Sequence, residues 1–173
     1  IPAVRTLQPS TDDLPISLLD TVKVEMSPRQ RRMMGIIDEE DYGPVKTKVR
    51  FELGLQGSHP SKGYLDEGVL ALKQYYAICF LDNNSHAISF ELDPFWHAHI
   101  LHTVLYHRFC KKLEIGYMHH APNDPNSQEE TAVLQIIYDH TQAAFEHCFS
   151  WISPIFNPPN HEKRWLVCLH YNQ

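Results

Sequence analysis

Hydrophobic residues recur every three or four positions in three stretches of the chain, and this spacing predicts three long helices. The inward face of the first would consist of Leu65, Val69, Leu72, Tyr76 and Cys79, and the run from Asp82 to Ser85 should end it. The second begins at Asp93–Pro94 and should reach about Leu113. The third opens at Glu129–Glu130 and should turn inward Val133, Ile136, Ile137, Ala144 and Cys148.

Hydrophobic residues at every second position predict a small sheet. The alternation is strictest at Val45, Thr47, Val49, Phe51, Leu53 and Leu55. Weaker alternations at 22–26 and 165–171 would supply pairing strands, so that the sheet joins the two chain ends to the 45–55 strand. A short helix should begin at Ser27–Pro28 and run through Ile37, and residues 56–63 should form a loop.

These elements predict an α+β fold that is dominated by helices, with a small sheet near the chain ends. A chain of 173 residues can form a single domain with its own hydrophobic core. Within that domain we expect an N-terminal arm, short helix and strand over 1–63, a helical core over 64–151 and a C-terminal strand over 152–173.

Composition narrows the classes of function. No apolar run approaches the roughly 20 residues that a membrane-spanning helix needs, and a net charge of −6 argues against a nucleic-acid-binding surface. The four cysteines lack zinc-ribbon spacing and the density of a disulfide-rich secreted domain, so we expect free, mostly buried thiols. We therefore expect a soluble, cytoplasmic protein that acts on a small molecule or peptide, with neither nucleic acid nor membrane as a partner.

Histidine is the unusual residue, because six of the twelve histidines lie between positions 97 and 120. His99 belongs to two overlapping stripes of the predicted helix and should therefore face the body of the protein. His102 lies three residues further on the same face, which is a usable spacing for two metal ligands. His97 lies about 200° from His99 around a straight helix, so the two cannot hold one ion.

The order of histidines from His97 to His102 mimics the metal motif of metallo-β-lactamase-type hydrolases. That motif needs an aspartate where this chain has Leu101, and it occupies a glycine-rich loop, whereas the flanks here are helical. We expect instead one transition-metal ion (zinc, iron or copper) between the 94–113 helix and the 119–120 turn. If the site is catalytic, Tyr106 would transfer protons.

The expected metal ligands are all histidines, namely His99, His120, His102 and His119, together with His97, which would serve an ion at the opposite side of the helix or hydrogen-bond a backbone carbonyl. His140 and His147 lie seven residues apart on the third helix and would join the site if the two helices pack together. One hypothesis is a metal-dependent tailoring enzyme, either oxidative or hydrolytic. The alternative is a non-catalytic binding or regulatory module with a structural histidine cluster, because buried histidines bonded to tyrosines also make ordinary cores.

A longer motif spans the same region. Its residues are Asp93, Trp96, His97, His99, Leu101, Thr103, Tyr106, Phe109 and Cys110, followed by His119, His120 and Pro122. In this order they resemble the hallmark of the glycine-rich domain-containing protein-like family, D-x-x-W-H-x-H-x-L-x-T-x-x-Y-x-x-F-C followed by H-H-x-P. Tyr138 and Thr141 resemble its later Y-x-x-T. The resemblance covers about residues 65–150 and implies which positions belong to the motif, without implying a reaction.

Overall fold

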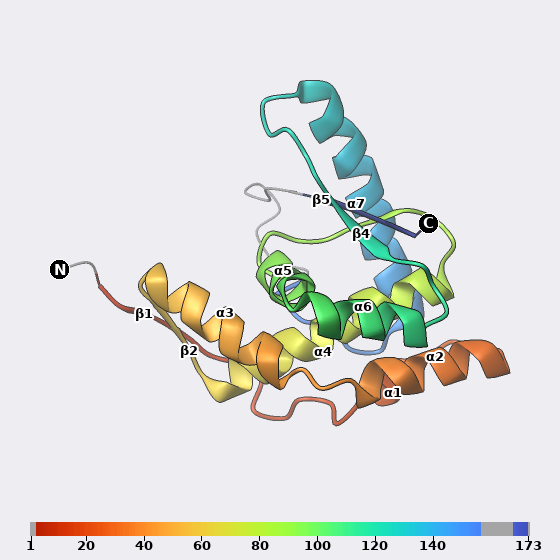
Figure 1. The fold of residues 1–173 in the computed structure, drawn as a ribbon, viewed down its shortest axis with the longest axis horizontal. Coiled ribbons are helices and arrows are strands. Elements are labelled where there is room, and N and C mark those ends of the chain that lie inside the picture. Colours follow the sequence, from red (N-terminus) through yellow and green to blue (C-terminus); the bar gives the residue numbers. More distant parts are fainter. Residues whose placement is uncertain (1–2, 157–167, 173) are drawn as a thin grey trace.

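Helices supply most of the fold in the computed structural model, which describes residues 3–156 and 168–172, with only the backbone at 120 and 168–172. The helices are α1 (Leu18–Thr21), α2 (Pro28–Glu39), α3 (Gly43–Leu55), α4 (Lys62–Leu81), α5 (Asp93–Leu101), α6 (Thr103–Lys112) and α7 (Gln128–Cys148). The strands are β1 (Arg5–Leu7), β2 (Ser58–Pro60), β3 (His86–Ala87), β4 (Met118–Pro122) and β5 (Cys168–Asn172). Figure 1 shows their arrangement. The expectation of a helix-dominated fold with little sheet is confirmed.

Helix α4 is the central element and packs against α1, α2, α3, α5 and α7. Its residues from Val69 to Leu72 and from Tyr75 to Ile78 are buried, so this helix is apolar on nearly all sides. Gly68 is the point of closest approach to α5, because a Cβ there would lie 2.0 Å from Cζ of Phe95. The predicted first helix is confirmed, because α4 spans Lys62–Leu81 and buries Leu65, Val69, Leu72 and Tyr76.

The strand predicted over residues 45–55 is wrong, because this segment forms helix α3. Val45 and Val49 are buried and Leu53 packs partly against the core, a spacing of four that defines one helical face. Phe51 and Leu55, which the alternation would have buried, are 61% and 74% exposed.

The single helix predicted over residues 94–113 is also wrong, because the chain breaks at His102 into α5 and α6. His102 has φ −81° and ψ 68°, outside the helical region. Its Nε2 lies 3.2 Å from the carbonyl oxygen of Pro44 at the start of α3, so this contact is made across the fold. The break also invalidates the expectation that His99 and His102 share one face of a straight helix.

Two separate sheets replace the one that was predicted. β1 pairs in parallel with β2, which lies in the segment expected to be a loop. The other sheet is antiparallel and has the order β3-β5-β4. Its central strand, β5, is the predicted C-terminal strand and spans Cys168–Asn172. Trp165 and Val167 lie outside the described residues. In the 22–26 segment, the described pairing is one isolated bridge from Val22 to Phe149.

Helix α7 is confirmed, but the face expected to point inward is only partly right. The buried stripe consists of Leu134, Tyr138, Thr141, Phe145 and Cys148, spaced three or four apart. Val133 and Ile136 are instead 49% and 70% exposed. The N-terminal half of α7 rises away from the rest of the fold, with β4 leading up to it (Figure 1). The projection explains why so much of its circumference is exposed.

A buried carboxylate connects the segment before α1 and the segment after α7 to α4. Glu67 is 1% exposed, and it accepts hydrogen bonds from the backbone N–H and hydroxyl of Ser10 at 2.7 and 2.6 Å. It also accepts one from the hydroxyl of Ser153 at 2.7 Å. These three short hydrogen bonds hold both segments against the helix.

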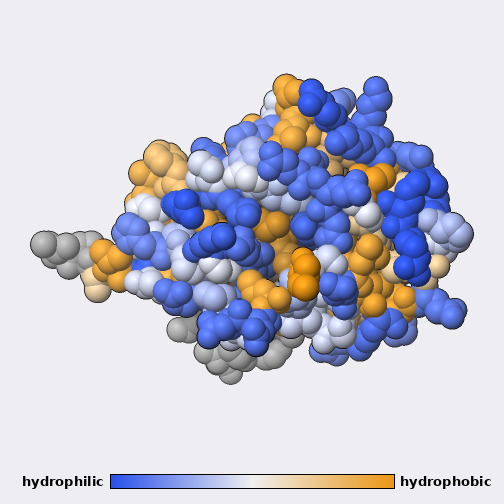
Figure 2. All heavy atoms as spheres, turned by 90° about the horizontal axis from the view of Figure 1, so that it is seen from below, coloured by the Kyte–Doolittle hydropathy of each residue, from blue (hydrophilic) through white to orange (hydrophobic). Residues whose placement is uncertain are grey.

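The surface and the thiols bear on the expectations from composition. On the face in Figure 2, hydrophobic side chains lie in several separate patches among hydrophilic ones. Within the described residues, none of the helices combines the length and hydrophobicity needed to cross a membrane. Cys79, Cys110 and Cys148 are free, and the last two are buried.

Candidate functional site

His99 is fully buried inside a cage of aromatic rings. The centroids of Tyr42, Tyr76, Tyr106 and Phe109 lie between 5.0 and 5.7 Å from that of its imidazole. Its Nδ1 lies 2.6 Å from the hydroxyl oxygen of Tyr76. Burial, with the charge on His102, lowers the pKa of His99 to about 3, so the ring is neutral at pH 7.

The other ring nitrogen of His99 faces a carboxylate. Nε2 of His99 lies 4.0 Å from Oε2 of Glu40, and neither atom has a hydrogen-bond partner among the described residues. Burial raises the pKa of Tyr76 well above its usual value, so the phenol keeps its proton in this contact. When the phenol donates to Nδ1, Nε2 carries the ring hydrogen and directs it toward Glu40, whose pKa is raised by burial. The result is a buried row of phenol, imidazole and carboxyl.

Tyr106, the predicted proton-transfer residue, is also buried and lies in the cage around His99. Its hydroxyl accepts a hydrogen bond from Nε1 of Trp96 at 3.2 Å and donates one to the carbonyl of Met118 at 2.5 Å. Burial raises the pKa of Tyr106 above its usual value. The hydroxyl is thus engaged in joining α5, α6 and β4.

The other predicted ligands are spread around this cage. His102 contacts the Pro44 carbonyl, and the ring of His119 packs edge-on against Tyr117 with centroids 4.9 Å apart. The side chain of His120 lies outside the part of the chain that the structure describes, although its backbone pairs with β5. Among the described side chains, no three or more histidines, cysteines, aspartates or glutamates are placed as they stand to hold a metal ion.

His97 lies on the opposite face of α5 and borders an open groove of about 510 Å³. The groove runs between α3, α5, β1 and β2, and its polar wall includes Arg5, Lys48, Glu52, Tyr64, Glu91 and His97. Lys48 forms an ion pair with Glu52 at 2.9 Å. The hydrogen bond from Lys48 and its positive charge lower the pKa of Glu52, and His97 adds a smaller effect in the same direction. Burial raises the pKa of Tyr64 to about 12, so its hydroxyl remains a donor.

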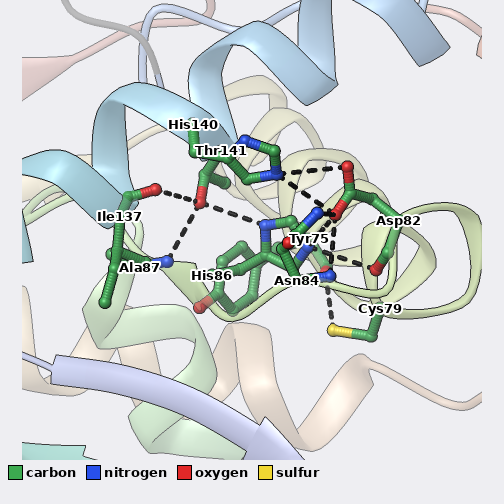
Figure 3. Close-up of polar contacts among 9 residues, drawn as sticks. All are labelled: Tyr75, Cys79, Asp82, Asn84, His86, Ala87, Ile137, His140 and Thr141. Carbon is green, nitrogen blue, oxygen red and sulfur yellow. Dashed lines mark hydrogen bonds and ion pairs between the residues drawn. The ribbon is translucent and has the colours of Figure 1, made fainter.

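A second polar cluster, at the junction of α4, β3 and α7, was not predicted (Figure 3). Nε2 of His140 lies 3.2 Å from both carboxylate oxygens of Asp82, and Nε2 of His86 lies 3.4 Å from Oδ1 of the same aspartate. The two imidazoles stack with centroids 5.8 Å apart. Nδ1 of His86 contacts the hydroxyl of Thr141 at 3.1 Å.

Sequence reasoning missed this cluster for two reasons. Asp82 was interpreted only as part of the turn that ends α4, and His86 was not considered. His140 was considered, but as a partner of the 94–113 helix, whereas it faces the end of α4. The one available signal was that His140 directly precedes Thr141, which is a position of the family motif. This adjacency does not reveal which segment of the chain lies opposite His140. His147 is exposed and lies away from this contact set.

The comparisons with known proteins identify the family of the chain. The model of the UCP032817-like family matches residues 53–146, more than half of the sequence, so the protein belongs to this family. The matched region contains the aromatic cage from α4 to α6, His97 and the cluster at Asp82. No curated protein and no solved structure matches the chain.

Proposed function

We propose that this protein is a binding module for a small organic molecule, which lies in the groove beside His97. The proposal rests on one observation: α5 directs His97 into the groove while His99, two residues later, is fixed in the core. Both histidines are hallmark positions in the family resemblance given above. One helix therefore combines a ligand-facing side chain with the residue that holds the helix in place.

The groove has the properties of a small-molecule site. Its volume falls within the roughly 300–1,000 Å³ that such sites occupy. Its apolar surface comes from Leu7, Leu53, Phe90 and Leu101, and Phe90 is 54% exposed. Charged groups of both signs border this surface. These features favour a ligand with an apolar part and at least one charged group.

The buried network on the other side of α5 acts as support for this site. The ring of His99 is held by Tyr76 from α4 and is enclosed by rings from α4, α6 and the segment before α3. Rotation of α5 would have to break the 2.6 Å bond and open the cage. Because binding sites work best on rigid elements, this network fixes the direction in which His97 points.

The test is a thermal-shift screen of the full chain with free amino acids and aromatic carboxylic acids, followed by ¹⁵N-edited NMR of any stabilising compound. At least one compound should raise the melting temperature and perturb amides of α3 and α5. His97→Ala should abolish the effect, whereas His107→Ala, which removes another exposed histidine, should preserve it. The proposal fails if no compound binds, or if both variants bind equally well.

The transition-metal site expected near His99 is the second candidate function. The observation that favours it is a pair of buried atoms 4.0 Å apart, Nε2 of His99 and Oε2 of Glu40, for which the described part of the chain supplies no hydrogen-bond partner. An ion with bonds of about 2.0–2.2 Å could bridge this gap. It would have to displace the Nε2 hydrogen and to recruit further ligands, for which His120 remains the proposed source.

This candidate is tested by elemental analysis of protein purified without a chelating column. His99→Ala and His120→Ala should each lower the metal content, and His107→Ala should not. Circular dichroism should first establish that each variant is folded. Equal metal content in all three variants, or none in the wild type, would exclude the site.

A further inference from the structure

One face of the molecule, outside the groove and the aromatic cage, is strongly basic. Its cations come from α2 and α6, and all of them are exposed: Arg29, Arg32, Arg108, Lys111 and Lys112. The two helices lie next to each other in Figure 1, and their side chains meet at Glu114, which is 3.8 Å from Nε of Arg29 and 3.3 Å from a terminal nitrogen of Arg32. We propose that this basic face binds an acidic segment of a partner protein.

The helix dipoles explain only part of this arrangement. Arg29 lies in the first turn of α2, where the helix dipole disfavours a positive charge, and that turn contains no acidic residue of its own. Lys111 and Lys112 lie in the last turn of α6, where the dipole does favour cations. Arg108, however, has these two like charges three and four residues away, which destabilises a helix. The stability of the two helices therefore does not explain why the five cations stand together.

Carboxylates leave most of the basic face unneutralised. Among the residues that the structure describes, Arg108 and the two lysines of α6 form no ion pair, whereas Lys46 and Lys73 each lie within 3.2 Å of an aspartate. The chain as a whole carries a net charge of −6. An anionic partner is thus repelled by much of the surface and is steered toward this face.

Glu114 holds the two arginines of α2 at the end of α6. Its φ of +59° lies in the left-handed region, which is strained for a residue other than glycine. The ion pairs with Arg29 and Arg32 do not offset this strain, because all three side chains are more than half exposed and such pairs contribute little to stability. The carboxylate does direct both guanidinium groups to one place. There they are ready to form paired hydrogen bonds with the carboxylates of a partner.

The shape of the face favours a peptide over a membrane. Its α6 side contains a shallow depression of about 520 Å³, bordered by Val104, His107, Arg108 and Lys111. Val104 is 70% exposed there, so an apolar side chain of the partner can pack between the cations. A flat anionic bilayer would not enter the depression, and its phosphates would repel Glu114. The occupant that fits is a segment in which acidic and apolar residues alternate.

The test is fluorescence anisotropy of two labelled peptides, one repeating Glu-Glu-Leu and the other Gln-Gln-Leu, titrated with the full chain. The acidic peptide should bind and the neutral one should not. Raising sodium chloride from about 50 to about 200 mM should weaken binding about ten-fold, because salt screens exposed charges. Amides of α6 and of the first turns of α2 should shift in ¹⁵N-edited NMR.

Variants separate this face from the net charge of the chain. Arg108→Glu with Lys111→Glu should weaken binding at least ten-fold. The matched control is Arg50→Glu with Lys62→Glu, which reverses two exposed cations on α3 and α4 and should have little effect. Glu114→Gln should strengthen binding about three-fold, because it removes the carboxylate that competes for the arginines. A misfolded variant could not produce this gain.

Four results would overturn the proposal. Three are equal binding of the two peptides, equal binding by the two charge-reversal variants, and weaker binding by Glu114→Gln. The fourth is sedimentation of the chain with phosphatidylserine vesicles in the absence of peptide binding, which would assign the face to a lipid surface. None of these results depends on the groove, because His97→Ala should bind the acidic peptide as the wild type does.

Discussion

Substitution of Gly68 by alanine should destabilise the protein, although alanine is the better helix former. Gly68 lies inside α4, where the added Cβ would meet three atoms of the Phe95 ring at 2.0, 2.3 and 2.6 Å. The nearest ring atom would have to move by about 1.4 Å to reach ordinary contact. Phe95 is fully buried, so its neighbours would have to move too.

The magnitude follows from two opposing terms. Alanine gains about 1 kcal/mol over glycine in a helix interior, and overpacking of this severity costs about 3 kcal/mol. We therefore expect Gly68→Ala to lower the free energy of unfolding by about 2 kcal/mol. Gly35→Ala in α2, where nothing lies within 4 Å of the added Cβ, should instead raise it by about 0.5–1 kcal/mol.

The assay is urea unfolding of the wild type and both variants, followed by circular dichroism. The expected gap between the variants is about 2–3 kcal/mol, or roughly 5–10 °C in melting temperature. Phe95→Leu removes the outer ring atoms, so the double variant with Gly68→Ala should be more stable than the sum of the two single effects. If Gly68→Ala proves as stable as Gly35→Ala, the close approach of α4 and α5 is not tight, and the reasoning fails.

Three further predictions concern buried or capping polar groups. The pKa of His99 is about 3 in the folded protein and about 6.5 in the unfolded chain, so the contribution of the neutral ring to the free energy of unfolding is complete above pH 6.5 and is lost as pH falls. The free energy of unfolding of the wild type should therefore fall by about 2 kcal/mol between pH 7 and 5, measured by urea titration at both values. His99→Gln should lose much less. Ser27→Ala removes the capping box of α2 and should cost about 1 kcal/mol by the same assay, whereas no loss would show that the cap is dispensable. Gln74→Leu removes hydrogen bonds to the Thr21 hydroxyl and the Trp151 carbonyl and should cost about 1–3 kcal/mol in thermal unfolding; a neutral result would mean that water replaces the amide.

The sequence predicted the long helices well where the apolar period was unambiguous. The face from Leu65 to Cys79 has a period of three and four only, and α4 formed as predicted. The apolar residues from Val45 to Leu55 fit a period of two and also a period of four. Positions four residues apart, such as Val45, Val49 and Leu53, lie on one face of a helix as well as on one face of a strand. A strand of eleven residues is unusually long, and this length was the signal in favour of a helix.

The candidate site was less accessible from sequence because it depends on contacts between distant segments. No glycine or proline marks the break at His102, which coincides with a contact to Pro44 more than fifty residues earlier. Without that break, His99 and His102 looked like one pair of ligands. The partner that His99 does face, Glu40, lies in a segment whose position relative to the histidine helix no periodicity reveals.

The bonds of Glu67 have a consequence for dissecting the protein. The family match spans residues 53–146 and contains Glu67, but Ser10 and Ser153, its hydrogen-bond donors, lie outside it on either side. A fragment limited to the matched residues would retain a carboxylate placed for burial without the donors that compensate it. It would also lose Met33, Met34 and Ile37 from the core. The unit that folds is therefore longer than the family match over residues 53–146. A fragment cut at the ends of that match should be unfolded or should aggregate.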